Sequence, residues 1–440
     1  MDLIVVAEII KAVSCSGILD YDYHGSDYFY SHSSEKARII DSITNMPSAT
    51  NTNSARFTVE PLPKDATKKT NFGAVINNLD LSNISDTDVD ALRKAIWEKK
   101  VVIVKGQKDL PPLKQWELVT RFDPDAPKVH SHGSLKTFNK QGGILSASRD
   151  VIGIPGAENV RLIGKGYQGA DHYGIKDKTV KKPLSHDWHV TELPAEDFES
   201  GHTRFQRWHL DAPLYERDPA WFTTLRCIKR PTSPKVTVHW DDGSGQTLET
   251  EPGLTAFFSN VQTYDLMTPE EKAMADHSWV EYAPHPYQWM GSCRGNPNGL
   301  GVACQGYEKS LEELGEWDSE FVKRYPMVWV NPVTGEKAFM VHGICVHKLF
   351  LRSSAKEEPK VIDKVEEIRS WLKPIQERIL RPEYIMLPEV EEGDIVMWAN
   401  WQCFHTAIDY PDAYGPRTMH QANVSASSAP VGPVPIPTHG

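Results

Sequence analysis

The stretch Arg207-Trp208-His209-Leu210-Asp211 decides how this chain is interpreted, because it places a histidine and a carboxylate two residues apart. In an extended strand, residues i and i+2 point to the same side, so His209 and Asp211 can reach one ion. A third ligand must come from elsewhere, and His405, at the end of Trp401-Gln402-Cys403-Phe404-His405, supplies it. Two histidines and one carboxylate leave coordination positions open, as a non-haem Fe(II) centre requires. These three residues therefore predict an Fe(II) site.

Arg417 follows His405 by 12 residues and extends the pattern. A guanidinium stays charged at any working pH and presents a planar fork of donors, so it can hold a carboxylate with two parallel hydrogen bonds. An acid that chelates iron through its keto acid end and carries a second carboxylate fits this arrangement. We therefore expect Arg417 to bind the distal carboxylate of 2-oxoglutarate.

The segment His239-Trp240-Asp241 has the same spacing and competes for the metal-binding role. It runs into Asp241-Asp242-Gly243-Ser244-Gly245, whose residue types end a strand and start a hairpin, so we interpret it as a strand end. Four further histidines are alternative ligands, but their neighbours carry no second half of a site. We interpret them as hydrogen-bonded pocket or surface histidines; they are His186, His189, His342 and His347.

The composition narrows the class of partner. A formal net charge of −11 disfavours a nucleic-acid ligand, which is bound mainly through clustered Lys and Arg, and favours a small organic substrate together with O2. Six cysteines without a Cys-x-x-Cys pair are typical of a reduced, cytoplasmic protein. The sequence lacks a basic secretory n-region and any apolar run of roughly 20 residues, so we expect no membrane partner. The sequence is compatible with a homo-oligomer.

We divide the chain into three parts. Residues 1–54 end in a polar, small-residue run, Met46 to Ser54, and are expected to form a flexible extension. Residues 55–426 are expected to form the folded domain. The Pro-rich segment 427–440, beginning at Ser427, is expected to be a disordered tail.

Local patterns predict helices outside a set of short strands. Ser85 can cap a helix that carries Val89, Leu92 and Ile96 on one stripe, and this helix leads into the strand 101–104. Residues 150–206 have weak periodicity and are expected to form long loops. Further strands are expected at 222–228, 236–238, 327–330 and 395–398, and further helices at 269–277 and 358–380. This pattern favours a mixed α/β fold with a double-sheet jelly-roll core.

The order of these parts resembles the TauD/TfdA superfamily of Fe(II)/2-oxoglutarate-dependent oxygenases over about residues 57–425. The motifs that carry the resemblance are His209-x-Asp211, Thr237, Asn331-Pro332-Val333-Thr334-Gly335, His405 and Arg417. The resemblance implies a double-stranded β-helix (jelly-roll) core flanked by helices, Fe(II) as the cofactor and 2-oxoglutarate as the cosubstrate. It also implies a threonine that joins the arginine in holding the oxoglutarate carboxylate, and Thr237 occupies the corresponding position.

Longer segments resemble the fungal 2-oxoglutarate-dependent xanthine dioxygenases within that superfamily. They are Asn71 to Ile76, Thr203 to Asp211, Asp241 to Gly245, Ala283 to Tyr287 and Glu391 to Asp394. This likeness implies hydroxylation of xanthine to urate, with release of succinate and CO2. It also implies a set of substrate-binding residues: Lys181, Glu196, Asp197, Gln421 and Asn423.

Gln421 and Asn423 suit a neutral purine better than an anion. Taurine-type enzymes carry a second arginine four residues beyond the first, where this chain has Gln421, which cannot neutralise a sulfonate. The two side-chain amides offer donors and acceptors that complement a purine edge.

Two other functions are weighed against xanthine hydroxylation. Pro213 and Asn400-Trp401-Gln402 depart from the xanthine enzymes near the iron ligands, so the same chemistry could act on another small molecule, such as a secondary-metabolite intermediate. The chain could also be an inactive relative in which the extension 1–54 binds a partner. The intact ligand triad and Arg417 argue against inactivity.

Overall fold

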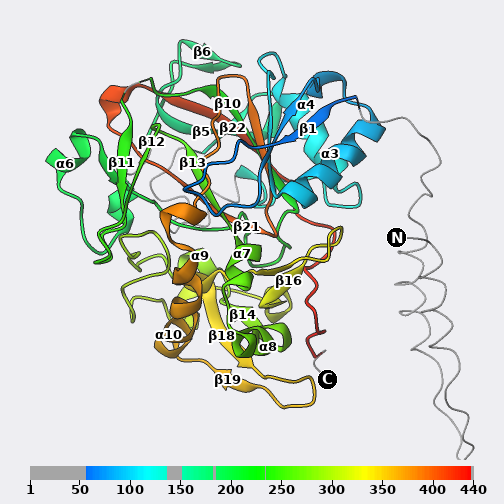
Figure 1. Cartoon of the computed structure of the whole chain (residues 1–440), viewed down its shortest axis with the longest axis vertical. Coiled ribbons are helices and arrows are strands. Elements are labelled where there is room, and N and C mark those ends of the chain that lie inside the picture. The colour runs from blue at the N-terminus through cyan, green and yellow to red at the C-terminus, as the bar shows by residue number, and fades with distance from the viewer. Residues whose placement is uncertain (1–55, 136–150, 182–184, 233, 438–440) are drawn as a thin grey trace, which may run out of the picture. The chain divides into compact units, whose positions relative to one another are not determined.

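The computed structural model describes residues 56–135, 151–181, 185–232 and 234–437 (Figure 1). The expected extension 1–54 lies outside the described residues. A nine-stranded sheet dominates the fold, and β8 (Thr179–Val180) joins it by pairing with β5. The other strands, in sheet order, are β1 (Thr58–Pro61), β2 (Ala74–Asn77), β3 (Val101–Val104), β20 (Ile395–Ala399), β10 (Phe222–Lys229), β22 (Arg417–Ala422), β5 (Ala157–Tyr167) and β4 (Ile152–Ile154).

Smaller sheets complete the β structure. The pair β13 (Thr255–Ser259) and β21 (Cys403–Ala407) carries part of the predicted iron site. The remaining sheets comprise β12 (Thr247–Thr250), β11 (Val236–His239) and β9 (His202–Arg204); β15 (Arg324–Pro326), β14 (Trp279–Tyr282), β18 (Val346–Leu351) and β19 (Lys360–Ile362); β16 (Val328–Val330) and β17 (Lys337–Phe339); and β6 (Asp171–His172) and β7 (Ile175–Lys176).

Helices lie beside these sheets, so the fold is mixed α/β. Figure 1 shows α3 and α4 near β1, and α8 and α10 around β14 and β18. The α-helices are α3 (Asp86–Lys99), α4 (Pro112–Phe122), α6 (Ala195–Glu199), α7 (Asn260–Asp265), α8 (Pro269–His277), α9 (Pro286–Trp289) and α10 (Val365–Gln376). None of the helices among the described residues is long and apolar enough to cross a membrane.

Several expected elements are confirmed. The Ser85 hydroxyl accepts a hydrogen bond from the Asp88 N–H at 3.2 Å and caps α3, whose Val89, Leu92 and Ile96 are buried. The β-branched run of β3 is buried along its whole length, between β2 and β20. The expected strands at 222–228, 236–238, 327–330 and 395–398 correspond to β10, β11, β16 and β20, and the helix at 269–277 is α8.

The expected helix at 358–380 is wrong in its first part. Residues Lys360–Ile362 form β19, which pairs with β18, and the α-helix begins only at Val365. Val361, inside the range expected to be helical, lies on the strand and is half exposed. Pairing with a neighbouring strand has overridden the helical pattern, as tertiary context often does.

The expectation of long loops between 150 and 206 is also wrong. β5 is an 11-residue strand, and it pairs with both β22 and β4. Its strand pattern is hidden because two charged residues, Arg161 and Lys165, are buried in it and glycines interrupt it. Gly164 is required here, since a Cβ at this position would lie 1.9 Å from the carbonyl oxygen of Arg417 on β22.

The expected disordered tail is not seen for residues 427–437, which run along the folded domain. The Ser427 N–H donates to an Asp123 carboxylate oxygen at 2.7 Å, and the Val330 N–H donates to the Val431 carbonyl at 2.9 Å. These hydrogen bonds satisfy backbone N–H and C=O groups of the segment. The Pro-rich composition alone does not predict them.

Candidate metal centre and cavity

A cavity of about 190 Å³ lies where residues of the large sheet meet residues of the β13–β21 pair. β5, β10, β20 and β22 contribute from the large sheet, and the segment 206–211 contributes beside β13 and β21. The lining residues are mostly apolar or basic: His130, His132, Val151, Arg161, Ile163, Gly164, Val180, Lys181, Gln206, Arg207, His209, Leu210, Asp211, Leu225, Thr255, Tyr287, Trp398, His405, Ala407, Arg417 and Gln421.

The backbone brings the two candidate histidine ligands together. The His209 N–H donates to the His405 carbonyl at 3.0 Å, and the His405 N–H donates to the His209 carbonyl at 2.9 Å. This isolated antiparallel bridge places the two ring centroids 4.2 Å apart. His209 and Asp211 were expected on a strand or strand end, and the bridge supplies the extended backbone without a regular strand.

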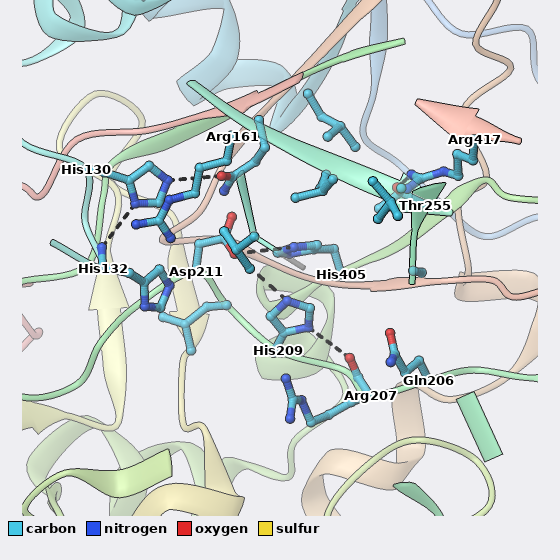
Figure 2. Close-up of a pocket in the computed structure, with 18 of the residues that line it drawn as sticks. His130, His132, Arg161, Gln206, Arg207, His209, Asp211, Thr255, His405 and Arg417 are labelled. Atoms are coloured by element: carbon cyan, nitrogen blue, oxygen red, sulfur yellow. Dashed lines mark hydrogen bonds and ion pairs between the residues drawn. The ribbon is translucent and has the colours of Figure 1, made fainter. Parts of the chain in front are cut away.

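The carboxylate lies beside both rings. Asp211 Oδ1 is 3.9 Å from His209 Nε2 and 3.7 Å from His405 Nε2 (Figure 2). A metal ion at the centre of such a triangle would be within reach of all three atoms. Across the described ranges, this is the one group of three or more His, Cys, Asp or Glu side chains close enough to share an ion.

Both histidines are prepared to act as neutral ligands. His209 Nδ1 lies 2.9 Å from the Arg207 carbonyl, so it must carry the proton, which leaves the lone pair on Nε2 facing Asp211. The His405 ring stacks on Phe257 and packs against Trp398, with centroids 5.9 and 4.7 Å away. Burial lowers the pKa of both histidines, and for His209 the neighbouring His405 lowers the pKa further.

Asp211 is held on both its side chain and its backbone. The Thr223 hydroxyl donates to Asp211 Oδ2 at 2.8 Å, which turns Oδ1 toward the histidines. Asn400 accepts from the Asp211 N–H and donates to its carbonyl, each at 2.8 Å. Asn423 Nδ2 donates to the Thr223 hydroxyl at 3.0 Å, so it supports the carboxylate through Thr223.

Asn423 is therefore not at the expected place. It is fully buried, accepts from the Ser131 hydroxyl at 2.7 Å and does not line the cavity. Strand parity would place Asn423 on the same face as Gln421, but β22 ends at Ala422, so the alternation of the strand no longer fixes the side on which Asn423 lies.

Arg417 lies at the end of the cavity where a cosubstrate carboxylate was expected. Its Nε donates to the Gly253 carbonyl at 2.6 Å and its Nη2 to the Thr255 hydroxyl at 3.4 Å. Burial lowers the pKa of Arg417, but a guanidinium stays charged in proteins. Two donors of the guanidinium are thus held by the protein, and the residue lines the cavity.

The structure brings Thr255, and not the expected Thr237, to the cavity beside Arg417. Thr237 lies on β11, is paired with β9 and β12, and does not line the cavity. Thr255 lines the cavity and contacts Arg417. Thr255 could have been found from the strand register. It stands two residues before Phe257, which pairs with His405, so the side chains of Thr255 and Phe257 lie on the same face of β13, the one that meets the metal site.

The remaining expected substrate residues divide into two groups. Gln421 and Lys181 line the cavity, and Gln421 Oε1 lies 3.0 Å from His130 Nε2. Glu196 and Asp197 are exposed on α6 and do not line the cavity, so the structure does not bring them to the site. Charged residues of a surface helix are usually solvated, which is the physical reason for this difference.

Among the basic residues that line the cavity, four were not assigned a role from the sequence: His130, His132, Arg161 and Arg207. Arg161 Nη2 donates to the Gly133 carbonyl at 2.9 Å. Burial lowers the pKa of Arg161 to about 10 and that of His132 to about 4, and Arg161 contributes to the second shift. His132 is therefore neutral between basic neighbours.

The alternative histidines have other partners. His239 Nε2 lies 2.8 Å from His202 Nδ1, and Asp241 forms an ion pair with Arg204 at 2.5 Å, so this pair does not face one ion. His189 Nε2 lies 3.1 Å from the Gln206 carbonyl, and His347 pairs with Glu281 at 3.6 Å. His342 is buried outside the cluster, and the side chain of His186 lies outside the described residues.

Comparison with known proteins identifies the family. The family model described as "Taurine catabolism dioxygenase TauD, TfdA family" matches residues 58–423. The chain belongs to this family.

Curated relatives support the same assignment. The chain is 44% identical to the alpha-ketoglutarate-dependent dioxygenase bsc9 of Alternaria brassicicola, over 86% of this chain and 96% of the relative. It is 45% identical to the alpha-ketoglutarate-dependent dioxygenase fc-dox of Phomopsis amygdali, over 83% and 92%. It is 37% identical to the alpha-ketoglutarate-dependent xanthine dioxygenase xanA of Emericella nidulans, over 85% and 98%. The protein is thus a 2-oxoglutarate-dependent dioxygenase, an enzyme that uses Fe(II) and 2-oxoglutarate.

Proposed function

We propose that His209, Asp211 and His405 hold Fe(II), and that Arg417 and Thr255 hold the distal carboxylate of 2-oxoglutarate. One observation carries the metal assignment: Asp211 Oδ1 lies at nearly equal distances, 3.9 and 3.7 Å, from the two histidine Nε2 atoms. The donor set of two neutral imidazoles and one carboxylate suits Fe(II) and leaves room for a chelating acid.

We further propose that the enzyme hydroxylates a small organic molecule in the cavity. Bound Fe(II) and 2-oxoglutarate supply the oxidising chemistry, with O2 consumed and succinate and CO2 released. The contribution of this chain is to orient both ligands and to exclude water. An apolar part of the cavity wall serves this purpose and is formed by Leu225, Ile163 and Trp398. Because Arg417 is buried, water screens its charge little.

We infer that the site is held in a double-stranded β-helix, or jelly-roll, core. The order of antiparallel strands β20, β10, β22 and β5 in the large sheet supports this, together with the cavity that they share with β13 and β21. Two facing walls of this kind explain how ligands from positions 209 and 405 meet.

Xanthine is a second candidate for the substrate, after a small molecule of another class. The relatives named xanthine dioxygenases and the positions of Lys181 and Gln421 in the cavity favour xanthine. Glu196 and Asp197 lie outside the cavity, and Asn423 acts behind Asp211, so three of the five expected contacts are absent. The relatives with higher identity have names that give no substrate.

A turnover assay tests this function. The purified protein is loaded anaerobically with Fe(II) and 2-oxoglutarate and then given O2, with and without xanthine, while succinate and urate are quantified. Succinate above the no-iron control supports the dioxygenase assignment of these ligands, and urate in equal amount identifies xanthine as the substrate. No succinate with xanthine speaks against xanthine as the substrate, whereas failure of the protein to bind Fe(II) together with 2-oxoglutarate contradicts the proposed site.

A further inference from the structure

His130 is a buried histidine of the cavity wall to which the proposed iron and 2-oxoglutarate site gives no role. It lies beside the end of β22, where it forms an isolated antiparallel bridge with Val424. Both of its ring nitrogens have partners (Figure 2): Nδ1 lies 3.2 Å from the His132 backbone nitrogen, and Nε2 lies 3.0 Å from Gln421 Oε1. The position of its proton therefore follows from these partners.

The partners of His130 fix which ring nitrogen carries the proton. The His132 backbone N–H is a donor, so Nδ1 must accept, and the proton of a neutral ring then lies on Nε2. Burial lowers the pKa of His130 well below its ordinary value, and the charge of Arg161 lowers it further, so the ring is neutral near pH 7. The Nε2–H group therefore donates to Gln421.

This donor decides how the Gln421 side chain is turned. An amide offers one acceptor oxygen and an NH2 donor, and only the oxygen can accept from His130. Gln421 lines the cavity, and among the described residues its side-chain nitrogen has no hydrogen-bond partner. Its backbone is held on both sides, since Gln421 pairs with Leu225 on β10 and with Arg161 on β5. The cavity thus receives an amide donor in a fixed orientation.

The residue after His130 orients a second amide in the same sense. The Ser131 hydroxyl donates to Asn423 Oδ1 at 2.7 Å, and Asn423 Nδ2 donates to the Thr223 hydroxyl at 3.0 Å. In both cases the amide oxygen is bound by the segment that begins at His130, and the amide nitrogen is left for the site. The nitrogen of Asn423 acts behind a metal ligand, whereas the nitrogen of Gln421 is available to a ligand.

We infer that His130 is a positioning residue: by holding the Gln421 amide, it makes the cavity select a substrate that offers a hydrogen-bond acceptor, such as a carbonyl oxygen, to the Gln421 nitrogen. This inference rests on the proposed function and names a chemical requirement of its substrate. A ligand with an N–H group at this place would face a second donor, and both would be left unpaired in a buried site. Loss of His130 should therefore relax the selection.

Nitrogen NMR of the histidine rings tests the first step without any ligand. The metal-free protein is labelled with ¹⁵N at its histidines, and the His130 signals are identified by their loss in His130→Phe. Near neutral pH we expect a proton on Nε2 and none on Nδ1. A proton on Nδ1, or on both nitrogens, would overturn the inference.

Paired probes test the consequence for ligands. 1-Indanone accepts hydrogen bonds and cannot donate, whereas indole, of similar bicyclic shape, donates through its N–H. Each is titrated calorimetrically, under anaerobic conditions, into protein loaded with Fe(II) and 2-oxoglutarate, and the absorption band of the iron–oxoglutarate complex is recorded before and after. We expect 1-indanone to bind at least about fivefold tighter than indole, the effect of one neutral hydrogen bond of about 1 kcal/mol.

Variants assign that preference to His130 and Gln421. His130→Phe removes the donor and frees the amide to turn, so the preference should fall below about twofold. Gln421→Glu replaces the amide nitrogen by an oxygen that accepts and cannot donate, so the preference should reverse in favour of indole. His277→Phe is the matched control, because His277 lies on α8 and does not line the cavity. It should keep the full preference.

The absorption band separates the inference from the proposed function. A wild-type protein that forms no band contradicts the proposed function. A protein that forms the band but binds the two probes alike, binds neither or prefers indole overturns the acceptor requirement alone. An unchanged preference in His130→Phe overturns the positioning role, and an unchanged preference in Gln421→Glu, which would mean that the acceptor is recognised elsewhere, also overturns it. A merely structural role would weaken both probes equally and would not reverse their order.

Discussion

The two sides of the cavity differ in how their polar groups are satisfied. On the side of the metal ligands and Arg417, side chains are fixed by neighbours: Thr223 holds Asp211, and Gly253 and Thr255 hold Arg417. On the other side, Arg207 has an Nε without a partner and no paired carboxylate among the described residues. The Asp211 carboxylate and the Arg417 guanidinium are thus organised before ligands bind, whereas the Arg207 guanidinium keeps an unsatisfied donor. Within the described residues, His405 Nδ1 is also buried without a hydrogen-bond partner, so preorganisation describes Asp211 and Arg417 and does not extend to every polar group of the metal side.

Removing a metal ligand should have the largest effect. His405→Ala should abolish turnover and iron retention. This loss exceeds the roughly 10- to 100-fold fall in metal affinity or activity that is typical when a residue supporting a ligand is replaced. Metal analysis after anaerobic loading and desalting measures this. His239→Ala removes the histidine of the competing His-x-Asp segment and should leave both iron content and turnover near wild type. A large loss in His239→Ala would contradict the ligand assignment.

Loss of the cosubstrate clamp should be the next largest effect. Arg417→Met removes a buried charge from a proposed ion pair, so 2-oxoglutarate binding should weaken by about 2–5 kcal/mol. Titration of the Fe(II)-loaded protein with 2-oxoglutarate measures it.

Two threonines sharpen the same test. Thr255→Val removes a hydroxyl proposed to donate to the charged carboxylate and should weaken 2-oxoglutarate binding by about 1.5–3 kcal/mol. Thr237→Val should leave that binding unchanged, because Thr237 does not line the cavity. The reverse order of effects would restore the role first expected for Thr237.

The support behind Asp211 should matter less than the ligand itself. Thr223→Val removes the hydroxyl that donates to Asp211 Oδ2 at 2.8 Å, with little change in side-chain shape. Iron affinity should fall by roughly 10- to 100-fold, as measured by competition with a chelator. An iron affinity equal to wild type would mean that Asn400 alone orients the carboxylate.

The smallest predicted effect concerns pH. Burial lowers the pKa of His342 to about 3 from 6.5, so the unfolded chain binds more protons than the folded chain below pH 6.5. The stability from this neutral histidine is present above pH 6.5 and is lost as pH falls toward 3. Urea unfolding of the metal-free protein at pH 7.5 and 5.5 measures this loss. Between these two pH values, the free energy of unfolding of His342→Phe should fall by about 1 kcal/mol less than that of the wild type. An equal loss would mean that His342 is protonated in the folded chain.

The metal side of the cavity could be predicted from the sequence, and the substrate side only in part. Residue type and order alone, without knowledge of packing, are enough to propose four residues of that side: His209, Asp211, His405 and Arg417. Thr255 could not be distinguished from Thr237 because the choice depends on the register of β13 against β21.

The substrate side depends on contacts that sequence does not contain. Arg161 lies on β5, a strand hidden by its own buried charges and glycines, and Arg207 stood inside the quoted motif without a partner to reveal its role. Glu196 and Asp197 were expected from resemblance alone, and α6 carries them on the surface. In the same way, the mixed α/β class followed from the short strands, but the pairing of β19 with β18 did not.

The most direct measurement is an anaerobic optical titration of the metal-free protein with Fe(II) in the presence of 2-oxoglutarate. The account predicts an iron–oxoglutarate absorption band that saturates at one iron per chain, because one cluster of ligands among the described residues can hold the ion. The band should be absent in Asp211→Ala. No band in the wild-type protein, or an unchanged band in Asp211→Ala, would contradict the metal centre on which the account depends.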